Sequence, residues 1–406
     1  MMLKGVSVLR ILLRKARQVY RDLQFERSLP PLAKRERKRD RGGLPIVDPG
    51  PESCIVSTLD WIRRAQDHSR TGDGGFARDF SLIKGCWASS YPETTGYIIP
   101  TLLECARKYN DADLRSRAMR ALDWLVSIQM PGGGFQGGTV DQEPRVAATF
   151  NTGQILLGLA AGVAEFGDAY RPSLRAAAHW LAESLDDDGC WRRHPTPFAA
   201  PGEKAYEAHV AWSLFEADRV DPGHGFGAAG LRQVQWVLRQ QRANGWFDKC
   251  CLGDPLRPLT HTLGYVLRGI IEAYRWSGGQ IFLQSAERTA DAMLNVVGRN
   301  GELPGRLDSK WRSASRWVCL TGNAQIAACY FLLNRFVGRP DFLDAGRRLN
   351  SCVRRTVCLD GTEEIRGGVK GSFPIDGAYC SYEYPNWAAK FFIDANLMEL
   401  QEADHG

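Results

Sequence analysis

Six clusters of polar and aromatic residues in this chain of 406 residues could carry out chemistry, and each opens an apolar segment with helical spacing. They lie at residues 91–97, 149–154, 206–212, 260–265, 321–325 and 382–387. A helix needs only one Ser, Thr, Asn or Asp to cap its start. These clusters also hold carboxylates, imidazoles, phenols and amides. If all six meet at one cavity, they predict a site that moves protons and binds hydroxyl groups.

The candidates for catalysis are five side chains: Glu93, Glu207, His209, His261 and Tyr384. A carboxyl group, or a histidine with a pKa near neutrality, can move a proton at a reacting atom. A tyrosine beside a cation can also act as a base. The residues leave a structural alternative open for each type. A first-turn carboxylate complements the helix dipole, a histidine can belong to the core, and a tyrosine can pack a loop.

Nine further side chains are candidates for substrate binding. They are Tyr91, Tyr97, Asn151, Tyr206, Asn323, Tyr382, Asn386, Trp387 and Lys390. Aromatic rings stack on sugar faces while amides bind hydroxyl groups, so the mixture suits a carbohydrate. We expect no cofactor. A zinc site would require Cys190, His194 and Cys250 to converge with a histidine of the clusters, so we expect no metal either.

The elements that position these clusters belong to a repeat. Glycine-aromatic loops at 73–76, 132–135, 188–191 and 244–247 place their last aromatic residues 59, 56 and 56 residues apart, and looser versions follow at 300–305 and 367–373. Two helical segments accompany each loop. A period this long indicates a repeat architecture, in which units too small to bury their own apolar faces pack on one another.

The two helical segments of each repeat differ in character. The first segments carry more charge, and we expect them near 52–67, 111–129, 171–185, 225–241, 279–298 and 339–357. The second segments are apolar nearly all round, and we expect them near 92–109, 149–166, 203–219, 259–277, 319–337 and 384–402. A helix that is apolar on every side is surrounded by protein. The pattern therefore predicts an all-α fold, an (α/α)6 toroid with an inner and an outer ring of helices.

This topology places the starts of all six inner helices around one mouth. Helix N-termini present unpaired N–H groups and the positive ends of helix dipoles, which favour an anionic ligand. The long loops add cations, namely Lys84, Arg145, Arg192, Arg193, Lys204, Lys249, Lys310, Arg312 and Lys370. We expect an electropositive mouth if some of these face inward; a solvated rim is the alternative.

A glutamine precedes three of the loops, at Gln66, Gln129 and Gln241. This pattern is similar to the Q-x-x-D-G-x-W signature of α/α-toroid proteins, and the resemblance covers residues 50–402. The superfamily includes a prenyltransferase and squalene-cyclase branch and a six-hairpin glycosidase-like branch. The resemblance implies the fold: the glutamine caps the helix end, glycine permits positive φ, and the aromatic residue wedges between helices.

The two branches of the superfamily differ in the catalytic residues that they require. The cyclase branch needs an acidic D-x-D-D run, which does not occur in the sequence, and Asp186-Asp-Asp188 is the nearest segment. Protein prenyltransferases need an Asp, a Cys and a His together on zinc, and the sequence offers no convincing match. Both points favour the glycan-processing members.

Charge divides the chain into two parts. Residues 1–48 hold 13 Lys or Arg and 5 Asp or Glu, a net charge of +8, whereas the whole chain carries +6, which leaves −2 for residues 49–406. We expect a basic N-terminal tail at 1–48 and the toroid domain at 49–406. Because the body is slightly acidic, we expect no nucleic-acid partner.

The tail predicts an amphipathic helix. Val8, Leu12, Ala16, Val19 and Leu23 share one face at helical spacing, opposite Arg10, Arg14, Arg17 and Arg21. Such a helix could lie on anionic lipid, and a helix packed on the body or a disordered arm are the alternatives. The sequence has no apolar run long enough to span a membrane, no secretory signal, and an odd number of cysteines, eleven, without Cys-x-x-Cys. We expect a cytoplasmic protein, peripheral at the inner membrane.

Taken together, these features predict a carbohydrate-active enzyme that acts on an anionic, uronate-type glycan during polysaccharide biosynthesis or processing. As a glycoside hydrolase it would use Glu93 and Glu207 as a carboxylate pair. As a lyase or epimerase it would use a histidine or tyrosine to abstract the proton next to the uronate carboxylate. Two other classes stay open: an isoprenoid cyclase or prenyltransferase, and a glycan-binding toroid without catalysis.

Overall fold

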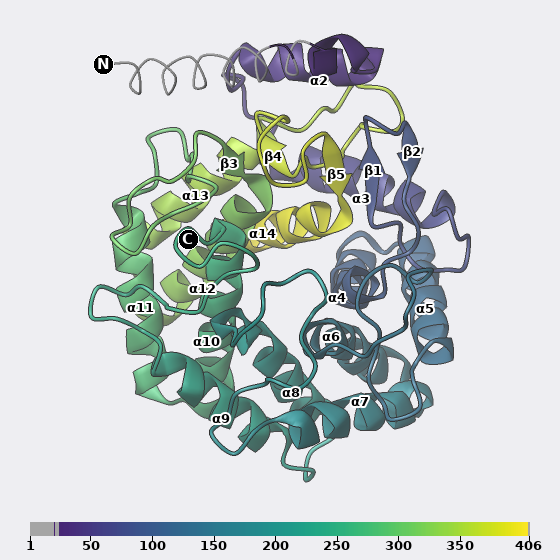
Figure 1. Cartoon of the computed structure of the whole chain (residues 1–406), viewed down its shortest axis with the longest axis vertical. Helices are drawn as coiled ribbons and strands as arrows, with labels where there is room; N and C mark the ends of the chain where they lie inside the picture. Colours follow the sequence, from purple (N-terminus) through teal and green to yellow (C-terminus); the bar gives the residue numbers. More distant parts are fainter. Residues whose placement is uncertain (1–19, 21–23, 405–406) are drawn as a thin grey trace, which may run out of the picture.

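The computed structural model describes residues 20 and 24–404, and it confirms the (α/α)6 toroid (Figure 1). The outer ring consists of α3 (Pro51–Asp67), α5 (Ala112–Ser127), α7 (Arg171–Ser184), α9 (Phe226–Leu238), α11 (Gln280–Leu294) and α13 (Pro340–Arg354). The inner ring consists of α4 (Pro92–Tyr109), α6 (Thr149–Phe166), α8 (Ala208–Val220), α10 (Thr260–Ser277), α12 (Leu320–Val337) and α14 (Asn386–Asp404). Each inner helix contacts the next, and α14 contacts α4, which closes the ring.

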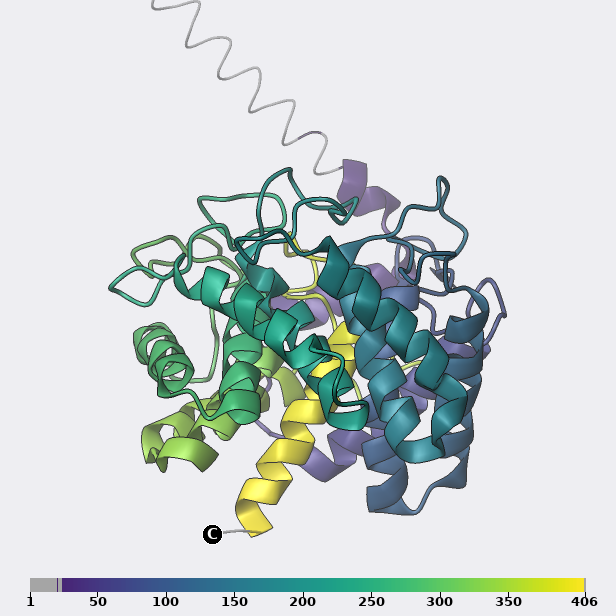
Figure 2. The same ribbon diagram turned by 90° about the horizontal axis from the view of Figure 1, so that it is seen from below.

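The long loops gather at one end of the toroid, opposite the C-terminal end of α14 (Figure 2). Two turns of 3-10 helix occur in the connections, Asp168–Tyr170 and Ala205–Glu207. The second turn delays α8, which begins at Ala208 and not near residue 203 as expected. The inner helices otherwise begin within two residues of their expected starts, so their first turns surround the loop end as the periodicity predicts.

Short antiparallel strands fasten the last repeat to the first. Strands β2 (Cys86–Trp87), β1 (Asp79–Ser81) and β5 (Glu383–Pro385) pair in that order, with Phe80 opposite both Trp87 and Tyr384. A second pair joins β3 (Val318–Cys319) to β4 (Ser372–Phe373). Because β5 directly precedes α14, the first pairing fixes the start of the last inner helix beside the first loop.

Glycine allows the first two inner helices to touch through their backbones. A Cβ atom on Gly96 of α4 would lie 2.3 Å from the Cα atom of Ile155, and one on Gly158 of α6 would lie 2.3 Å from the carbonyl oxygen of Gly96. No side chain fits in either place. The two helices therefore cross in direct contact, and the side chains of their first turns come within hydrogen-bonding distance.

The first two aromatic loop residues are held against the starts of inner helices. Phe76 and Phe135 are fully buried, and their backbone N–H groups donate to the hydroxyls of Thr95 and Thr152, at 3.0 and 2.9 Å. The aromatic residues thus wedge between helices as expected, and the hydroxyls of the inner helices fix the loops that surround the mouth.

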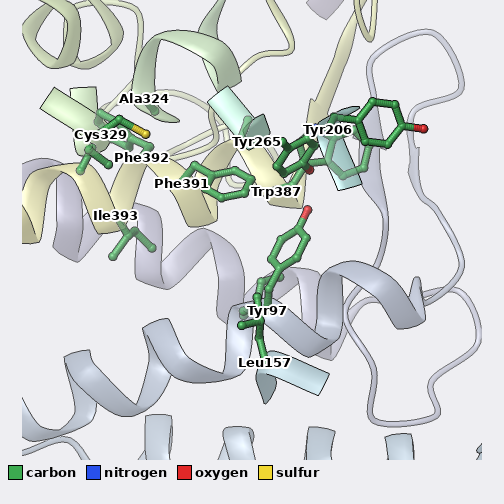
Figure 3. Close-up of a cluster of buried hydrophobic side chains, with 14 of the residues drawn as sticks. Tyr97, Leu157, Tyr206, Tyr265, Ala324, Cys329, Trp387, Phe391, Phe392 and Ile393 are labelled. Atoms are coloured by element: carbon green, nitrogen blue, oxygen red, sulfur yellow. The ribbon is translucent and has the colours of Figure 1, made fainter. Parts of the chain in front are cut away.

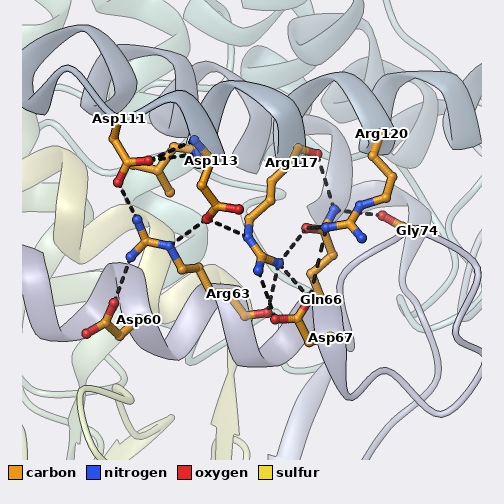
Figure 4. A network of polar contacts seen from close by, with 10 residues as sticks. Asp60, Arg63, Gln66, Asp67, Gly74, Asp111, Asp113, Arg117 and Arg120 are labelled. Atoms are coloured by element: carbon orange, nitrogen blue, oxygen red, sulfur yellow. Dashed lines mark hydrogen bonds and ion pairs between the residues drawn. The ribbon is translucent and has the colours of Figure 1, made fainter.

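The loop glutamines differ from the expected helix cap. Gln66 Nε2 donates to the carbonyl oxygens of Gly74, at 2.9 Å, and Arg117, at 3.2 Å. It therefore joins its loop to the next outer helix, inside a network of ion pairs between α3 and α5 (Figure 4). Gln129 makes the equivalent pair of bonds with Gly133 and Ser173. These amides donate hydrogen bonds to carbonyl groups of a neighbouring repeat. The sequence of a single repeat does not indicate such a contact.

Helix α2 (Pro31–Arg41), part of the expected tail, packs on the toroid through charged groups. Lys370 pairs with Asp40, and its ammonium lies 3.3 Å from Glu36. All three side chains are at most 2% exposed. Asp40 also accepts a bond from the backbone N–H of Ile375 at 2.8 Å, and Tyr384 donates to Glu36 at 3.1 Å. This buried cluster ties the start of the chain to the segment before α14.

The structure leaves the membrane hypothesis untested. The amphipathic helix expected between Val8 and Leu23 lies, apart from Tyr20, outside the described residues. No helix in the described part of the chain is long and apolar enough to cross a membrane. The division of the chain at residue 48 also stays a prediction.

Lys370→Met should lower the free energy of unfolding by about 3–5 kcal/mol, because it leaves the buried carboxylate of Asp40 without a counter-ion and Glu36 with Arg39 alone. Arg37 offers a matched control, since its pair with Asp376 lies at the surface of the same contact, where Arg37→Gln should cost less than about 1 kcal/mol. Urea denaturation of both variants measures the difference. Equal stability of Lys370→Met and the unchanged protein would show that the cluster does not hold α2.

Candidate functional site

A cavity of about 370 Å³ opens at the loop end of the toroid, where the inner helices begin. We call it the central cavity. Its walls come from five of the six repeats and consist of Arg78, Tyr91, Glu93, Tyr97, Thr139, Gln142, Phe150, Thr196, Phe198, Tyr206, Leu252, His261, Tyr265, Tyr379, Cys380 and Trp387. Among these residues Glu93 is the only carboxyl group and His261 the only histidine. Six of the candidates from the sequence therefore meet here: Tyr91, Glu93, Tyr97, Tyr206, His261 and Trp387.

Glu93 lies in the first turn of α4 and is buried at the cavity wall. Its Oε2 atom accepts bonds from the Tyr91 hydroxyl, at 3.0 Å, and from Asn151 Nδ2, at 2.8 Å. Burial raises the pKa of Glu93 from 4.5 to about 7, although the bond from Tyr91 and the charge of Arg78 lower it. A carboxyl whose pKa lies near neutrality can give or take a proton at neutral pH.

His261 lies in the first turn of α10 and presents a neutral imidazole. Its Nδ1 atom is 2.8 Å from Gln325 Oε1 on α12. An amide oxygen can only accept, so Nδ1 carries the proton and Nε2 keeps a free lone pair. Burial lowers the pKa of His261 to about 4, while the bond with Gln325 raises it. The ring is held in one orientation and is ready to act as a base.

His209 lies behind the cavity wall and not in it. Its Nδ1 atom is 2.8 Å from Gln154 Oε1, and its ring packs edge-on against Tyr265 with centroids 4.6 Å apart. Tyr265 in turn packs against His261 at 4.4 Å. Burial lowers the pKa of His209 well below its usual range, so it is neutral. His209 therefore supports the ring of Tyr265, which lies between the two histidines and faces the cavity.

Aromatic side chains line the cavity, and Figure 3 draws Tyr97, Tyr206, Tyr265 and Trp387 among them. Within the described chain the hydroxyls of Tyr97 and Tyr206 have no hydrogen-bond partner, although both are buried. Trp387 Nε1 donates to the Tyr379 hydroxyl at 2.9 Å, which fixes the indole ring. A buried hydroxyl without a partner costs about 1–3 kcal/mol, so a polar ligand or water would gain from filling this space. Flat rings and unpaired hydroxyls together suit a sugar.

Arg78 is the only cation among the residues that line the central cavity. It pairs with Asp79 at 2.5 Å and lies 3.6 Å from Glu383, and its guanidinium is 5.3 Å from the centroid of the Trp387 ring. Arg78 thus holds the indole ring and places some positive charge at the mouth.

Most of the loop cations expected at the mouth are paired elsewhere. Arg192 pairs with Asp188, and Lys249 with Glu203. Lys370 is buried beneath α2, as described above. The expectation of a broadly electropositive mouth is corrected to one cation in the central cavity, because carboxylates pair with most of the other loop cations, although not with Lys204.

Glu207 does not reach the central cavity. It lies in the 3-10 turn before α8 and faces an adjoining cavity, and the wall formed by Tyr206 and Thr196 separates the two. The delayed start of α8 turns this carboxyl outward. Glu93 and Glu207 therefore do not form the carboxylate pair that hydrolysis would require.

Five other candidates lie outside the central cavity, which corrects their expected role. Tyr384 points to Glu36 of α2, and Tyr382 packs against Phe25. The side chains of Asn323 and Asn386 donate to the loop carbonyls of Gly301 and Ala77, so both hold loops. Lys390 pairs with Asp394 at 2.5 Å, one turn below the start of α14.

Sequence reasoning missed Arg78, Tyr265 and Tyr379. Tyr265 follows His261 by one helical turn on an apolar helix, so its position on the cavity face could have been read from spacing. Arg78 and Tyr379 come from loops, and their spacing carries no such signal. No group of three or more His, Cys, Asp and Glu side chains within residues 24–404 lies in a position to hold a metal ion.

The raised pKa of Glu93 makes stability depend on pH. The folded state binds this proton more tightly than the unfolded state, whose pKa is near 4.5, so stability should fall as the pH rises from 4.5 to about 7. Between pH 4.5 and 8 the free energy of unfolding of the unchanged protein should fall by about 3 kcal/mol relative to that of Glu93→Gln, which has no titrating carboxyl at this position. Urea denaturation of both proteins at the two pH values measures it. A stability difference that is independent of pH would contradict the raised pKa.

The chain is similar in fold to several proteins of known structure. No protein-family model matches the chain, and no curated protein matches it. A solved unsaturated glucuronyl hydrolase specific for heparin is 15% identical, with a TM-score of 0.69 over 87% of this chain and 97% of that one. A D-mannose isomerase is 10% identical, with a TM-score of 0.70 over 89% and 100%. A cellobiose 2-epimerase from Bacillus thermoamylovorans is 10% identical, with a TM-score of 0.65 over 86% and 97%. The chain has the six-hairpin (α/α)6 toroid fold of these proteins.

Proposed function

We propose that the chain is a carbohydrate-active enzyme that moves protons on a uronate-type glycan bound in the central cavity. The observation that carries this proposal is the pairing of Glu93, a carboxyl with a pKa of about 7, with His261, a neutral imidazole, in one cavity. Glu93 acts as the acid and His261 Nε2 as the base.

The geometry favours proton abstraction over hydrolysis by two carboxylates. A glycosidase with two carboxylates places both beside the scissile bond. The central cavity offers Glu93 alone, whereas it adds His261 and the phenols of Tyr97, Tyr206 and Tyr265. In a lyase or epimerase, His261 Nε2 would take the proton next to the uronate carboxylate. In a lyase the enolate would then expel the glycosidic oxygen from the adjacent carbon, and this oxygen would take the proton of Glu93 as the double bond forms. In an epimerase Glu93 would return a proton to the opposite face of the same carbon. The hydroxyls of Tyr97 and Tyr265 would donate bonds to the developing enolate.

An acidic sugar suits the polar groups that are present. Arg78 is a cation at the cavity wall, although Asp79 and Glu383 balance its charge, and the ring of Trp387 supplies a stacking surface. The similar solved structures act on sugars by their printed names, and one pairs a glucuronyl hydrolase variant with the oligosaccharide dGlcA-Glc-Rha-Glc. An isoprenoid cyclase is less favoured because the sequence lacks the acidic D-x-D-D run that such an enzyme needs.

A hydrolase is the second candidate, and the protonation of Glu93 favours it. Such a carboxyl could protonate the leaving oxygen while His261 activates a water molecule. The products distinguish the two reactions. A lyase creates a double bond that absorbs ultraviolet light, an epimerase incorporates deuterium from heavy water without cleavage, and a hydrolase releases a new reducing end without forming a double bond.

Replacing the proposed acid and base tests the function. Incubated with oligomers of galacturonate, glucuronate and mannuronate, Glu93→Gln and His261→Asn should each lose at least about 100-fold in turnover, the usual contribution of a general acid or base. The rate of the unchanged enzyme should fall as the pH rises through about 7, since Glu93 then loses its proton. His179→Asn, on the exposed face of α7, is the matched control. Full activity of either cavity variant would refute the proposed roles.

We also propose that the protein works at the cytoplasmic face of a membrane during polysaccharide assembly. Support comes from the exposed side of α2, which carries Lys34, Arg35, Lys38 and Arg41. The protein should sediment with vesicles that contain a third phosphatidylserine and should be released by high salt. Equal recovery with neutral vesicles would contradict this placement.

A further inference from the structure

A second cavity of about 470 Å³ adjoins the central cavity. We call it the side chamber. The loop 191–204 encloses it, and Thr149, Tyr206 and Glu207 form its inner wall. Thr196 and Tyr206 line both spaces, so a single side-chain layer separates them. Each volume falls in the range of a small-molecule site.

The side chamber contains buried polar atoms that nothing in the described chain satisfies. Glu207 Oε2, the hydroxyl of Tyr206 and the hydroxyl of Thr149 have no hydrogen-bond partner, and all three residues are at most 4% exposed. Their residues belong to two neighbouring repeats and all line this chamber. Since each unsatisfied group costs about 1–3 kcal/mol, the side chamber is built to receive a polar occupant.

The charge of the side chamber favours an acidic occupant. Lys204 is 5% exposed and forms no ion pair with any carboxylate among residues 24–404, whereas its neighbour Arg192 is neutralised by Asp188 and Glu203. Burial raises the pKa of Glu207 to about 8, although the charge of Lys204 lowers it. At neutral pH Glu207 is therefore mostly uncharged and able to donate a hydrogen bond. The ammonium of Lys204 is left as the unbalanced charge.

Prolines restrict the backbone of the loop that encloses the side chamber. This loop contributes Pro195, Pro197 and Pro201 to the lining, and proline fixes the backbone φ angle. Its carbonyl at His194 accepts from the backbone N–H of Thr149 at 2.9 Å, which fastens the loop to the start of α6. A rigid enclosure reduces the entropy lost when a ligand binds.

We propose that the side chamber binds a second, acidic sugar unit of the glycan whose reacting unit occupies the central cavity, with the linkage between the two units crossing the layer formed by Thr196 and Tyr206. Lys204 would pair with the acid group of that unit, and Glu207, Tyr206 and Thr149 would bond to its hydroxyls. This inference rests on the proposed function and narrows its substrate: the ligand is an oligosaccharide with acidic units in succession, and a monosaccharide fills the site only in part.

Calorimetric titration with the monomer and trimer of galacturonate, glucuronate and mannuronate tests the proposal. The unchanged protein should bind the trimer of at least one series roughly tenfold or more tightly than its monomer, the gain from one charge-assisted contact. Lys204→Met removes the charge, and Ala199→Phe fills the side chamber without changing charge. Both should lose the preference for the trimer and still bind the monomer as before. Arg193→Met, in the same loop but outside the lining, should behave like the unchanged protein.

The outcomes separate this inference from the proposed function. If Glu93→Gln abolishes turnover while Lys204→Met and Ala199→Phe keep the preference for the trimer, the side chamber does not bind the second unit. Equal affinity of the unchanged protein for monomer and trimer also overturns the inference. If the unchanged protein binds no uronate of either length, the proposed function fails, and the inference fails with it.

Discussion

The direct contact between inner helices is the constraint on which the rest of the structure depends. Glycine lies where the helices cross: Gly96 against the backbone of α6, and Gly322 within 2.9 Å of the His261 backbone nitrogen, measured from an added Cβ atom. At that separation the first-turn side chains of adjacent helices reach one another. Glu93 meets Asn151, and His261 meets Gln325, in bonds of 2.8 Å. A wider ring would leave these groups in water and without orientation.

Burial at the mouth acts on the two kinds of titrating group in opposite directions, and this produces both an acid and a base. Removing water disfavours the charged form of each group. Glu93 therefore retains a proton at higher pH, and His261 releases one at lower pH. Between these two pKa values the carboxyl is protonated while the imidazole is neutral. One environment thus prepares both members of the pair, and no metal ion needs to be invoked for their protonation states.

The sequence predicts the rings well and the site only in part. The period of the loops and the difference in polarity between paired helices specify the toroid, and Glu93 and His261 follow because they occupy first turns. The position of a residue along a helix is readable at 1.5 Å per residue, so Lys390, one turn into α14, could have been placed deeper than the mouth. The sequence does not indicate in which direction around the ring of helices a side chain points. Tyr384 lies on a strand whose pairing with β1 sends its ring to α2, and that pairing joins segments 300 residues apart.

The anchoring of α2 has a consequence for how the protein tolerates shortening. Asp40 holds the backbone of Ile375, and four residues later the same segment delivers Tyr379 to the cavity wall, where it orients Trp387. Contacts from both the first and the last part of the chain therefore hold one wall of the central cavity in place. Truncation before residue 49 would remove that anchor along with the positive charge. The trimmed protein would keep its rings of helices but lose the support of the surface on which the ligand is proposed to stack.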